Sequence, residues 1–338
     1  MVFFNVFFRT LGFLFGLLIF IFIINIFVFY FDNNKKKQFY FVDGDENSEN
    51  IIATINLNGP ILNNYNNILG NNFFDYIDPS IVKNYLNDLQ KLDIKVLIIK
   101  INSPGGTVSA TAELEDVLIK FKKETNSTIY FFTKEILASG GYWVATSADM
   151  IFASYGSIIG SIGVSGPSWF YYDNPISLSN GILGQSIETK NGIKVYNQNA
   201  GQSKDLFNPY RKPKNDEIKH LQKIVDDVYE DFATKVSKSR KLDISFVKNN
   251  IGALIYTSHQ AKENYLIDNV SDYETLIEFI INENKFNDYK ILESRIKSSL
   301  IENLLSTYFK RNINEYKQFC KKLELSVNVV IPLFIKSC

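Results

Sequence analysis

The chain has 338 residues, enough to bury a sizeable core in one large or two modest domains. Lysine plus arginine total 36, as do aspartate plus glutamate, so no excess of positive charge favours a nucleic acid as partner. The two cysteines, Cys320 and Cys338, form no Cys-x-x-Cys pattern, which argues against a zinc site. The sequence leaves two alternatives for them, a disulfide between the two or two free thiols. The two histidines, His220 and His259, are expected to be structural or solvated.

Residues 1–31 are predicted to form an N-terminal tail and a transmembrane anchor. Leu11 to Phe31 is almost entirely apolar, and a helix of this length spans roughly 30 Å, the thickness of the hydrocarbon core of a bilayer. A cleavable signal peptide is the alternative, but no small-x-small cleavage site follows Phe31. We therefore expect an uncleaved anchor that contacts lipid through residues 11–31. Arg9 precedes the anchor and Lys35 to Lys37 follow it. Counting basic residues alone predicts that the chain after the anchor lies in the cytoplasm.

The rest of the chain predicts alternating strands and helices. Residues 32–49 are polar and turn-rich, which indicates a flexible linker. Strands are expected at 51–57, 96–101, 129–132 and 150–153, with a loop at 63–78 and an amphipathic helix through Leu114, Leu118 and Phe121. A long helix with one apolar stripe follows Pro213 and ends near Lys241. This alternation predicts a parallel β-α-β architecture, an α/β fold. Residues 276–338 are expected to form a helical C-terminal extension.

Ser139 is the first candidate for catalysis. It lies in Ala138-Ser-Gly-Gly141, between an expected strand and an expected helix. At a helix N-terminus a serine hydroxyl lies beside free backbone N–H groups that can stabilise an oxyanion, and the glycines let a substrate backbone approach closely. The alternative is that Ser139 only caps the helix, as serines often do. A second glycine turn, Ser103 to Gly106, ends the preceding strand, and the carboxyl ends of strands are where ligands bind in such sheets.

A serine nucleophile needs a base, and Lys204 is a candidate because it lies in a loop of small residues before the long helix. A lysine acts as a base only where burial lowers its pKa well below the ordinary value of ~10.4. A solvated surface lysine is the alternative, and the pattern of residues alone does not choose Lys204.

Several segments together resemble the signal peptide peptidase A family. They occur in order: Ile101-Asn-Ser-Pro-Gly-Gly106, Ala138-Ser-Gly-Gly-Tyr-Trp143, Gly160-Ser-Ile-Gly-Val164, Gly201-Gln-Ser-Lys-Asp205, and Tyr256-Thr-Ser-His-Gln-Ala261 through Asp268. The resemblance covers roughly residues 50–275, and the ordered set is specific although each motif alone is weak. It implies a Ser/Lys peptidase domain over 50–275 with a ClpP/crotonase-type fold, placed outside the cytoplasm. For the orientation we follow the resemblance over the count of basic residues.

The resemblance also implies roles for individual residues. Ser139 matches the nucleophile, Lys204 the general base and Ser161 a serine that orients this lysine; a turn serine is the alternative for Ser161. Gly106 and Gly140 match the positions whose N–H groups form the oxyanion hole. No cofactor and no metal are implied.

Two departures from the family pattern stand out. Tyr265 replaces a usual glycine, which predicts strain in that turn. Lys204 follows Ser139 by 65 positions, longer than expected, and an insertion around Ser177 to Lys194 is expected to alter the substrate groove.

The function that the resemblance implies is a membrane-anchored serine endopeptidase that degrades cleaved signal peptides and other hydrophobic or unfolded segments. The single catalytic copy implies the short family form, which assembles as a homo-oligomeric ring. One alternative is a related membrane protease with a dedicated protein substrate, which substrate profiling would distinguish. The other is a non-catalytic scaffold of the same fold.

Overall fold

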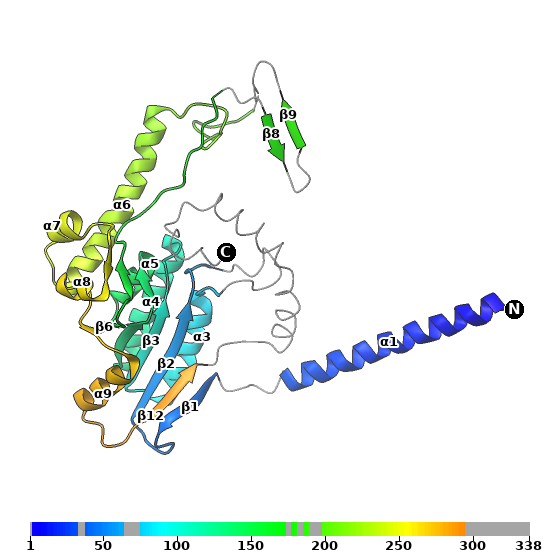
Figure 1. Cartoon of the computed structure of the whole chain (residues 1–338), viewed down its shortest axis with the longest axis horizontal. Helices are drawn as coiled ribbons and strands as arrows, with labels where there is room; N and C mark the ends of the chain where they lie inside the picture. Colours follow the sequence, from blue (N-terminus) through cyan, green and yellow to red (C-terminus); the bar gives the residue numbers. More distant parts are fainter. Residues whose placement is uncertain are drawn as a thin grey trace.

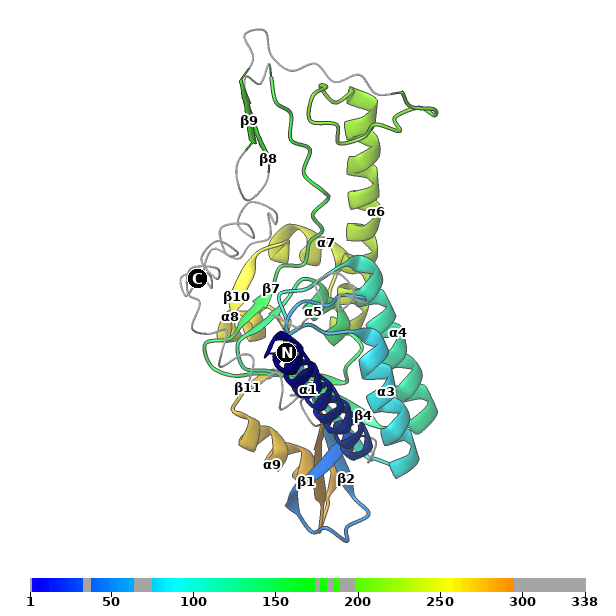
Figure 2. The same cartoon turned by 90° about the vertical axis from the view of Figure 1, so that its right-hand side faces the viewer.

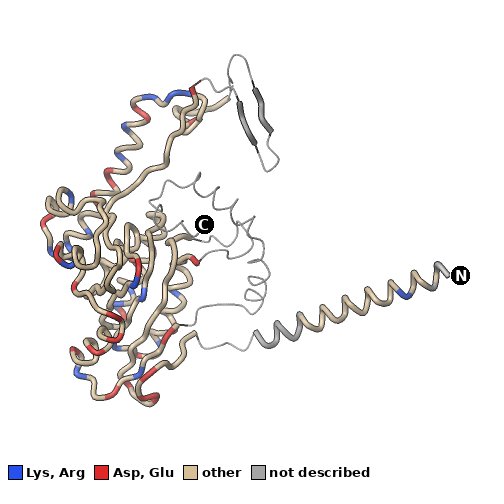
Figure 3. Tube along the Cα trace, in the orientation of Figure 1, with Lys and Arg blue, Asp and Glu red and all other residues tan. Residues whose placement is uncertain are grey.

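The computed structural model describes residues 2–32, 38–63, 75–173, 177–180, 185–188 and 198–294. Helix α1 (Val2–Asp32) is apolar throughout, and Arg9 is the one charged residue before Asp32 (Figure 3). Within the described residues one stretch, Val6–Ile24, is long and apolar enough to cross a membrane, and none of it is buried. It overlaps the anchor predicted at 11–31.

A seven-stranded sheet forms the centre of the described residues (Figure 1). Its strand order is β1 (Phe39–Gly44), β12 (Lys290–Ser294), β2 (Ile51–Asn58), β3 (Val96–Asn102), β4 (Thr128–Thr133), β6 (Met150–Ala153) and β11 (Asn269–Val270). Every neighbouring pair is parallel except β1 with β12, which is antiparallel. The predicted parallel α/β architecture is therefore confirmed, as are the four strands expected from the sequence.

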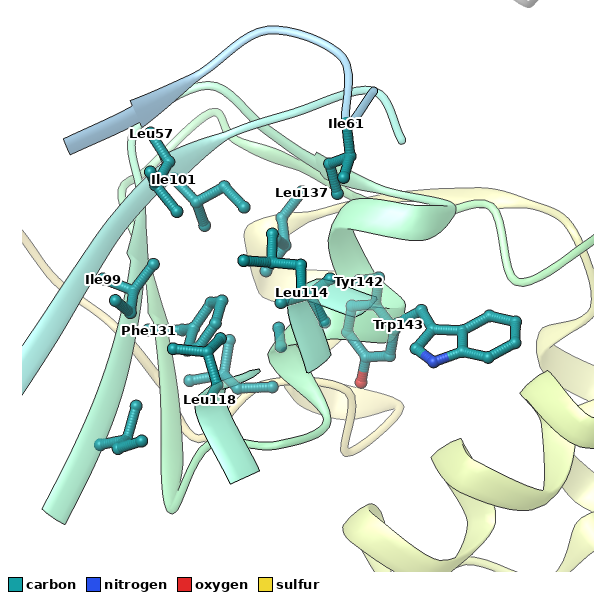
Figure 4. Close-up of a cluster of buried hydrophobic side chains, with 14 of the residues drawn as sticks. Leu57, Ile61, Ile99, Ile101, Leu114, Leu118, Phe131, Leu137, Tyr142 and Trp143 are labelled. Carbon is teal, nitrogen blue, oxygen red and sulfur yellow. The ribbon is translucent and has the colours of Figure 1, made fainter. Parts of the chain in front are cut away.

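Helices cover both faces of this sheet because successive strand residues point to opposite sides. Leu114 and Leu118 of α4 (Val108–Thr125) pack with Ile99 and Phe131 on one face (Figure 4). Helix α3 (Pro79–Leu89) lies beside α4. On the opposite face, α9 (Tyr273–Asn284) packs its apolar residues against the alternate positions of the same strands, among them Ile98. Strands buried on both faces explain why the sequence shows continuous apolar runs there.

A smaller sheet lies beyond the carboxyl end of β3. Its order is β10 (Ile255–Thr257), β7 (Ile158–Gly160) and β5 (Ile136–Ala138), with β5 and β7 parallel. The N–H of Ser103 donates to the carbonyl of Ile136 at 2.8 Å, which joins the two sheets. Helix α5 (Gly140–Ala145) follows β5 directly, so Ser139 lies where a strand of the smaller sheet becomes a helix.

The long helix α6 (Asn215–Arg240) is confirmed, but its apolar residues are fully buried only toward its C-terminal end. Phe232, Ala233 and Val236 are buried in the core, whereas Ile218 and Ile224 are each 49% exposed. Its N-terminal end extends away from the sheets (Figures 1 and 2). Shorter elements are η1 (Gln90–Leu92), α7 (Ile244–Phe246), η2 (Val247–Ile251), α8 (Ser258–Glu263) and a hairpin of β8 (Ser177–Asn180) with β9 (Gln185–Glu188).

Two predicted boundaries are wrong. The expected linker 32–49 contains β1, which the local sequence did not indicate because its partner β12 is distant in the chain. The expected helical extension 276–338 begins inside α9 and includes β12, which pairs with β2 in the main sheet. Residues 295–338, with both cysteines, and most of the loop predicted at 63–78 lie outside the described residues.

The strain predicted at Tyr265 is present, since this residue has a φ of 61° in the left-handed region. That region costs a non-glycine residue about 1 kcal/mol. Replacing Tyr265 by glycine is therefore expected to raise the free energy of unfolding by about 0.5–1 kcal/mol, less the extra freedom that glycine gains in the unfolded chain. Urea denaturation checks this. Tyr155→Gly is the control, because Tyr155 has no positive φ and its replacement is expected to destabilise. A lower stability for Tyr265→Gly would contradict the strain.

Candidate active site

Ser139 occupies a sharp turn between β5 and α5. Its backbone has a φ of 52° and a ψ of −125°, a region that non-glycine residues rarely adopt. Its side chain makes no capping hydrogen bond to the helix, so the helix-capping alternative is not supported. A strained strand-to-helix turn is one way in which proteins present a serine nucleophile to a substrate.

The turn from Ser103 to Gly106 lies directly against Ser139. A Cβ placed on Gly105 would lie 2.8 Å from the Cβ of Ser139, 3.1 Å from its Oγ and 2.9 Å from the nitrogen of Gly140. Gly105 also has a φ of 109°, so both its conformation and its surroundings require glycine. The two glycine turns that the sequence singled out are therefore in contact.

Two backbone N–H groups beside Ser139, those of Gly106 and Gly140, have no acceptor among the described residues. A Cβ on Gly140 would lie 3.2 Å from the nitrogen of Gly106, which places the two donors close together. That Cβ would also lie 2.5 Å from the buried hydroxyl of Thr111, so only glycine fits at this position. Paired free donors next to a serine are the arrangement that an oxyanion hole requires.

Ser161 lies next to Ser139. Ala138 and Gly160 are paired residues of the parallel strands β5 and β7, and the N–H of Ser139 donates to the carbonyl of Gly160 at 2.9 Å. Ser161 follows Gly160 directly and has a φ of 52°. The structure thus brings Ser139, Ser161, Gly106 and Gly140 to one place.

Lys204 is not brought to this place within one chain. It lies in a turn, Gly201 to Phe207. Ser203 of this turn hydrogen-bonds to Glu217 at the N-terminal end of α6, and Asp205 pairs with Arg211 just before that helix. Helix α5 packs at the other end of α6, where Trp143 stacks on Phe232 with ring centroids 5.0 Å apart. Along the helix axis, Glu217 and Phe232 are separated by roughly 22 Å. Lys204 is exposed, so a single chain does not bury it as a lysine base requires.

An ion cluster that the sequence analysis missed surrounds the turn of Lys204. Arg211 contacts the carboxylates of Asp205 and Glu217 at 2.6 and 2.8 Å. The hydrogen bonds from Arg211, with further ones from Ser203 and Lys214, lower the pKa of Glu217 to about 2. Because this folded-state pKa lies below the ordinary value of 4.5, the stabilisation is present above that pH and lost as the pH falls toward 2.

A buried carboxylate connects the helix that follows Ser139 to α6. Glu115 of α4 accepts a hydrogen bond from Nε1 of Trp143 at 2.9 Å and one from Nζ of Lys235 at 2.8 Å. The side chain of Glu115 is only 5% exposed. The helices α4, α5 and α6 are therefore held together at one buried point.

No group of three or more histidine, cysteine or acidic residues that could hold a metal occurs in the described part of the chain. His259 makes an edge contact with the ring of Tyr155, and His220 is exposed on α6.

The model of peptidase family S49 matches residues 121–286. The protein named "Putative signal peptide peptidase SppA" from Enterococcus faecium is 31% identical over 215 residues, which cover 62% of this chain and 58% of that protein. Residues 121–286 of the chain therefore resemble peptidase family S49. The sheet topology confirms the predicted α/β fold class.

Other similar proteins include Protease 4 from Salmonella typhi, 23% identical over 54% of this chain and 27% of that protein. This chain spans less than two thirds of the length of these curated relatives. A lysine-to-alanine mutant of the 1510-N membrane-bound stomatin-specific protease, solved with a substrate peptide, aligns at a TM-score of 0.42 and 13% identity over 77% of this chain and 98% of that one. A ClpP1 mutant from Listeria monocytogenes aligns at 0.41 and 13% identity over 66% and 92%. At these scores the two solved structures say nothing about the site.

Proposed function

We propose that this chain is a membrane-anchored serine endopeptidase that uses Ser139 as nucleophile and Lys204 of a neighbouring copy as general base. The observation that carries the proposal is the geometry around Ser139. Its strained turn lies beside two unoccupied backbone donors, and this arrangement suits acyl transfer.

In the proposed mechanism, the Oγ of Ser139 attacks the carbonyl carbon of a peptide bond, and the uncharged amine of Lys204 accepts the proton of the hydroxyl. The N–H groups of Gly106 and Gly140 hold the oxyanion of the tetrahedral intermediate. Lys204 then donates the proton to the leaving amine, and an acyl-enzyme on Ser139 remains. Water, deprotonated by Lys204, releases the acyl group. Ser161 orients Lys204.

A second copy is needed because Lys204 lies at the far end of α6 from Ser139. The same end of the molecule exposes apolar side chains that a second copy would bury. Besides Ile218 and Ile224, the segment that runs along α6 exposes Phe170, Tyr171 and Tyr172. Gly166 of this segment lies beside Val225, and the N–H of Tyr172 donates to Pro209 at 2.8 Å. A homo-oligomeric ring would bury these exposed apolar side chains and would bring Lys204 of one copy to Ser139 of its neighbour.

The substrate class follows from the anchor. In this proposal helix α1 anchors the peptidase domain at a membrane surface, on the extracytoplasmic side that the resemblance to the signal peptide peptidases implies. Cleaved signal peptides and other hydrophobic segments accumulate there. A dedicated protein substrate is the alternative, and mass spectrometry of the products from a peptide library distinguishes the two. Ser139→Ala protein is the blank in that experiment.

Two inactive variants are expected to restore activity to each other when they are assembled together. Ser139→Ala keeps the lysine and Lys204→Arg keeps the serine. If the lysine is delivered by a neighbour, random assembly of an equal mixture gives about a quarter of the wild-type peptide cleavage rate. The measurement is cleavage of a fluorogenic peptide after the two proteins are mixed in detergent and allowed to exchange subunits.

Each variant assembled alone serves as the control, and both should be inactive. If a mixture with proven subunit exchange stays at the level of the controls, delivery of Lys204 by a neighbour is wrong.

A further inference from the structure

The turn that carries Lys204 is fixed on both sides of the lysine. The hydroxyl of Ser203 donates to the carboxylate of Glu217, and the carboxylate of Asp205 is paired with Arg211. Ser203 also has a φ of 59°, so the turn bends sharply just before the lysine. The flanking residues therefore hold the backbone, while the side chain of Lys204 itself is exposed.

Arg211 is at the centre of this arrangement. Its Nε and Nη2 donate to the two carboxylate oxygens of Asp205 at 2.6 and 2.8 Å. Its Nη1 and Nη2 donate to the two oxygens of Glu217, both at 2.8 Å. A planar guanidinium fits two carboxylates in this way, whereas the ammonium group of a lysine is a single point charge.

The same guanidinium also contacts the segment 166–172, which runs along α6. It lies 5.1 Å from the ring centroid of Trp169, whose Nε1 donates to the carbonyl of Asn208 at 3.2 Å. Phe207, at the end of the lysine turn, packs on Trp169 with centroids 5.3 Å apart. Arg211 therefore joins the lysine turn, the first turn of α6 and this neighbouring segment.

An exposed ion pair contributes little to the stability of a fold, but the pair of Arg211 and Glu217 is largely buried. The side chain of Glu217 is 4% exposed and that of Arg211 is 22% exposed. Glu217 also accepts the backbone N–H of Lys214 at 2.9 Å, which fixes it to the start of α6. Such a network defines one geometry for the turn before any neighbour arrives.

We propose that Arg211 is a positioning residue for the general base: with Glu217 and Asp205, it holds the turn of Lys204 in the orientation that enters the active site of a neighbouring copy. This inference rests on the proposed function, in which Lys204 acts on the serine of another chain. Arg211 touches neither the substrate nor Ser139. Its effect on the reaction passes through the backbone on either side of Lys204.

The test uses Arg211→Lys, which keeps the positive charge but cannot form both bidentate contacts. In the homo-oligomer, kcat is expected to fall on the order of 10- to 100-fold, because a base displaced by about 1 Å loses this much. KM and the mass of the assembled particle are expected to stay unchanged. Arg240→Lys is the matched control. Arg240 also pairs with an acidic residue, Asp268, but at the opposite end of α6. That variant is expected to lower the melting temperature with little change in kcat.

A mixing experiment then separates positioning from a general structural role. Arg211→Lys is placed either in the Ser139→Ala chain, which supplies the working lysine, or in the Lys204→Arg chain, which supplies the working serine. The first mixture is expected to lose the same 10- to 100-fold relative to the mixture without Arg211→Lys. The second is expected to match that reference mixture.

Equal losses in the two mixtures would overturn the inference, as would a wild-type kcat for Arg211→Lys in the homo-oligomer. A failure of the proposed function looks different. In that case the reference mixture of Ser139→Ala and Lys204→Arg is itself inactive, or Ser139→Ala alone retains turnover. When the reference mixture is inactive, delivery to a neighbouring copy is wrong, and the comparison of Arg211→Lys with Arg240→Lys in the homo-oligomer shows only whether Arg211 supports kcat.

Discussion

Ser139→Ala is expected to lower kcat for peptide cleavage by about 10³- to 10⁶-fold, because loss of the nucleophile removes the acyl-enzyme route altogether. A fluorophosphonate probe is expected to label the wild-type protein at Ser139 and to leave the variant unlabelled. Peptide turnover and mass spectrometry of the labelled peptide measure the two effects. The fold and the particle mass are expected to be unchanged, since the Ser139 side chain makes no capping hydrogen bond that alanine would remove.

Ser147 provides the control for this substitution. It follows α5, only eight positions after Ser139, and its hydroxyl donates to the carbonyl of Val144 at 2.7 Å. Ser147→Ala is expected to retain both labelling and cleavage. Full turnover by Ser139→Ala would remove Ser139 from the mechanism. A lack of labelling in the wild-type protein under conditions of cleavage would favour a different nucleophile, and a lack of both would favour the non-catalytic scaffold.

Lys204→Arg is expected to have the second-largest effect, a loss of activity of about 10³-fold or more, because a guanidinium stays protonated at any usable pH and cannot accept a proton. For the wild-type protein, kcat/KM is expected to rise toward alkaline pH as the amine becomes neutral. The measurement is the pH dependence of cleavage for the wild-type protein, beside the activity of the variant at each pH.

Lys212→Arg is the matched control, since Lys212 lies near the same turn, is exposed and retains its charge in the variant. It should cleave at the wild-type rate. A flat pH profile across the alkaline range, or an active Lys204→Arg protein, would contradict a lysine base.

The elements that the sequence predicted best are those whose neighbours in the chain decide their structure. The strand β3 and the helix α4 show this, because burial on both faces and a stripe of apolar residues are visible within a few residues. The strain at Tyr265 was predictable from the family resemblance, because the family usually has glycine at that position.

The part of the site around Ser139 was predicted from motifs, and the structure brings its four residues together. The relation of Lys204 to Ser139 was not predictable in this way. It depends on the length and direction of α6. It also depends on the side chains of Ile218 and Ile224, which are exposed in a single chain. The role of Arg211 was missed because its two acidic partners, on opposite sides of Pro213, look like ordinary surface charges in a sequence. Only the folded structure shows that both carboxylates bind the same guanidinium.

The strands β1 and β12 were missed for a related reason. Neither has a partner nearby in the chain, and a six-residue strand with an exposed surface carries a weak pattern. Their pairing is a property of the completed sheet.

The position of β12 between β1 and β2 also determines how the protein is made. Gly44 pairs with Lys290, so the ribosome adds 245 residues between these two partners. At cellular rates of synthesis that takes roughly 10–50 s. Throughout that interval β1 has no partner strand in the sheet, and the edge of β2 that later receives β12 is unpaired. The sheet is therefore completed late in biosynthesis, after the hydrophobic N-terminus has long emerged.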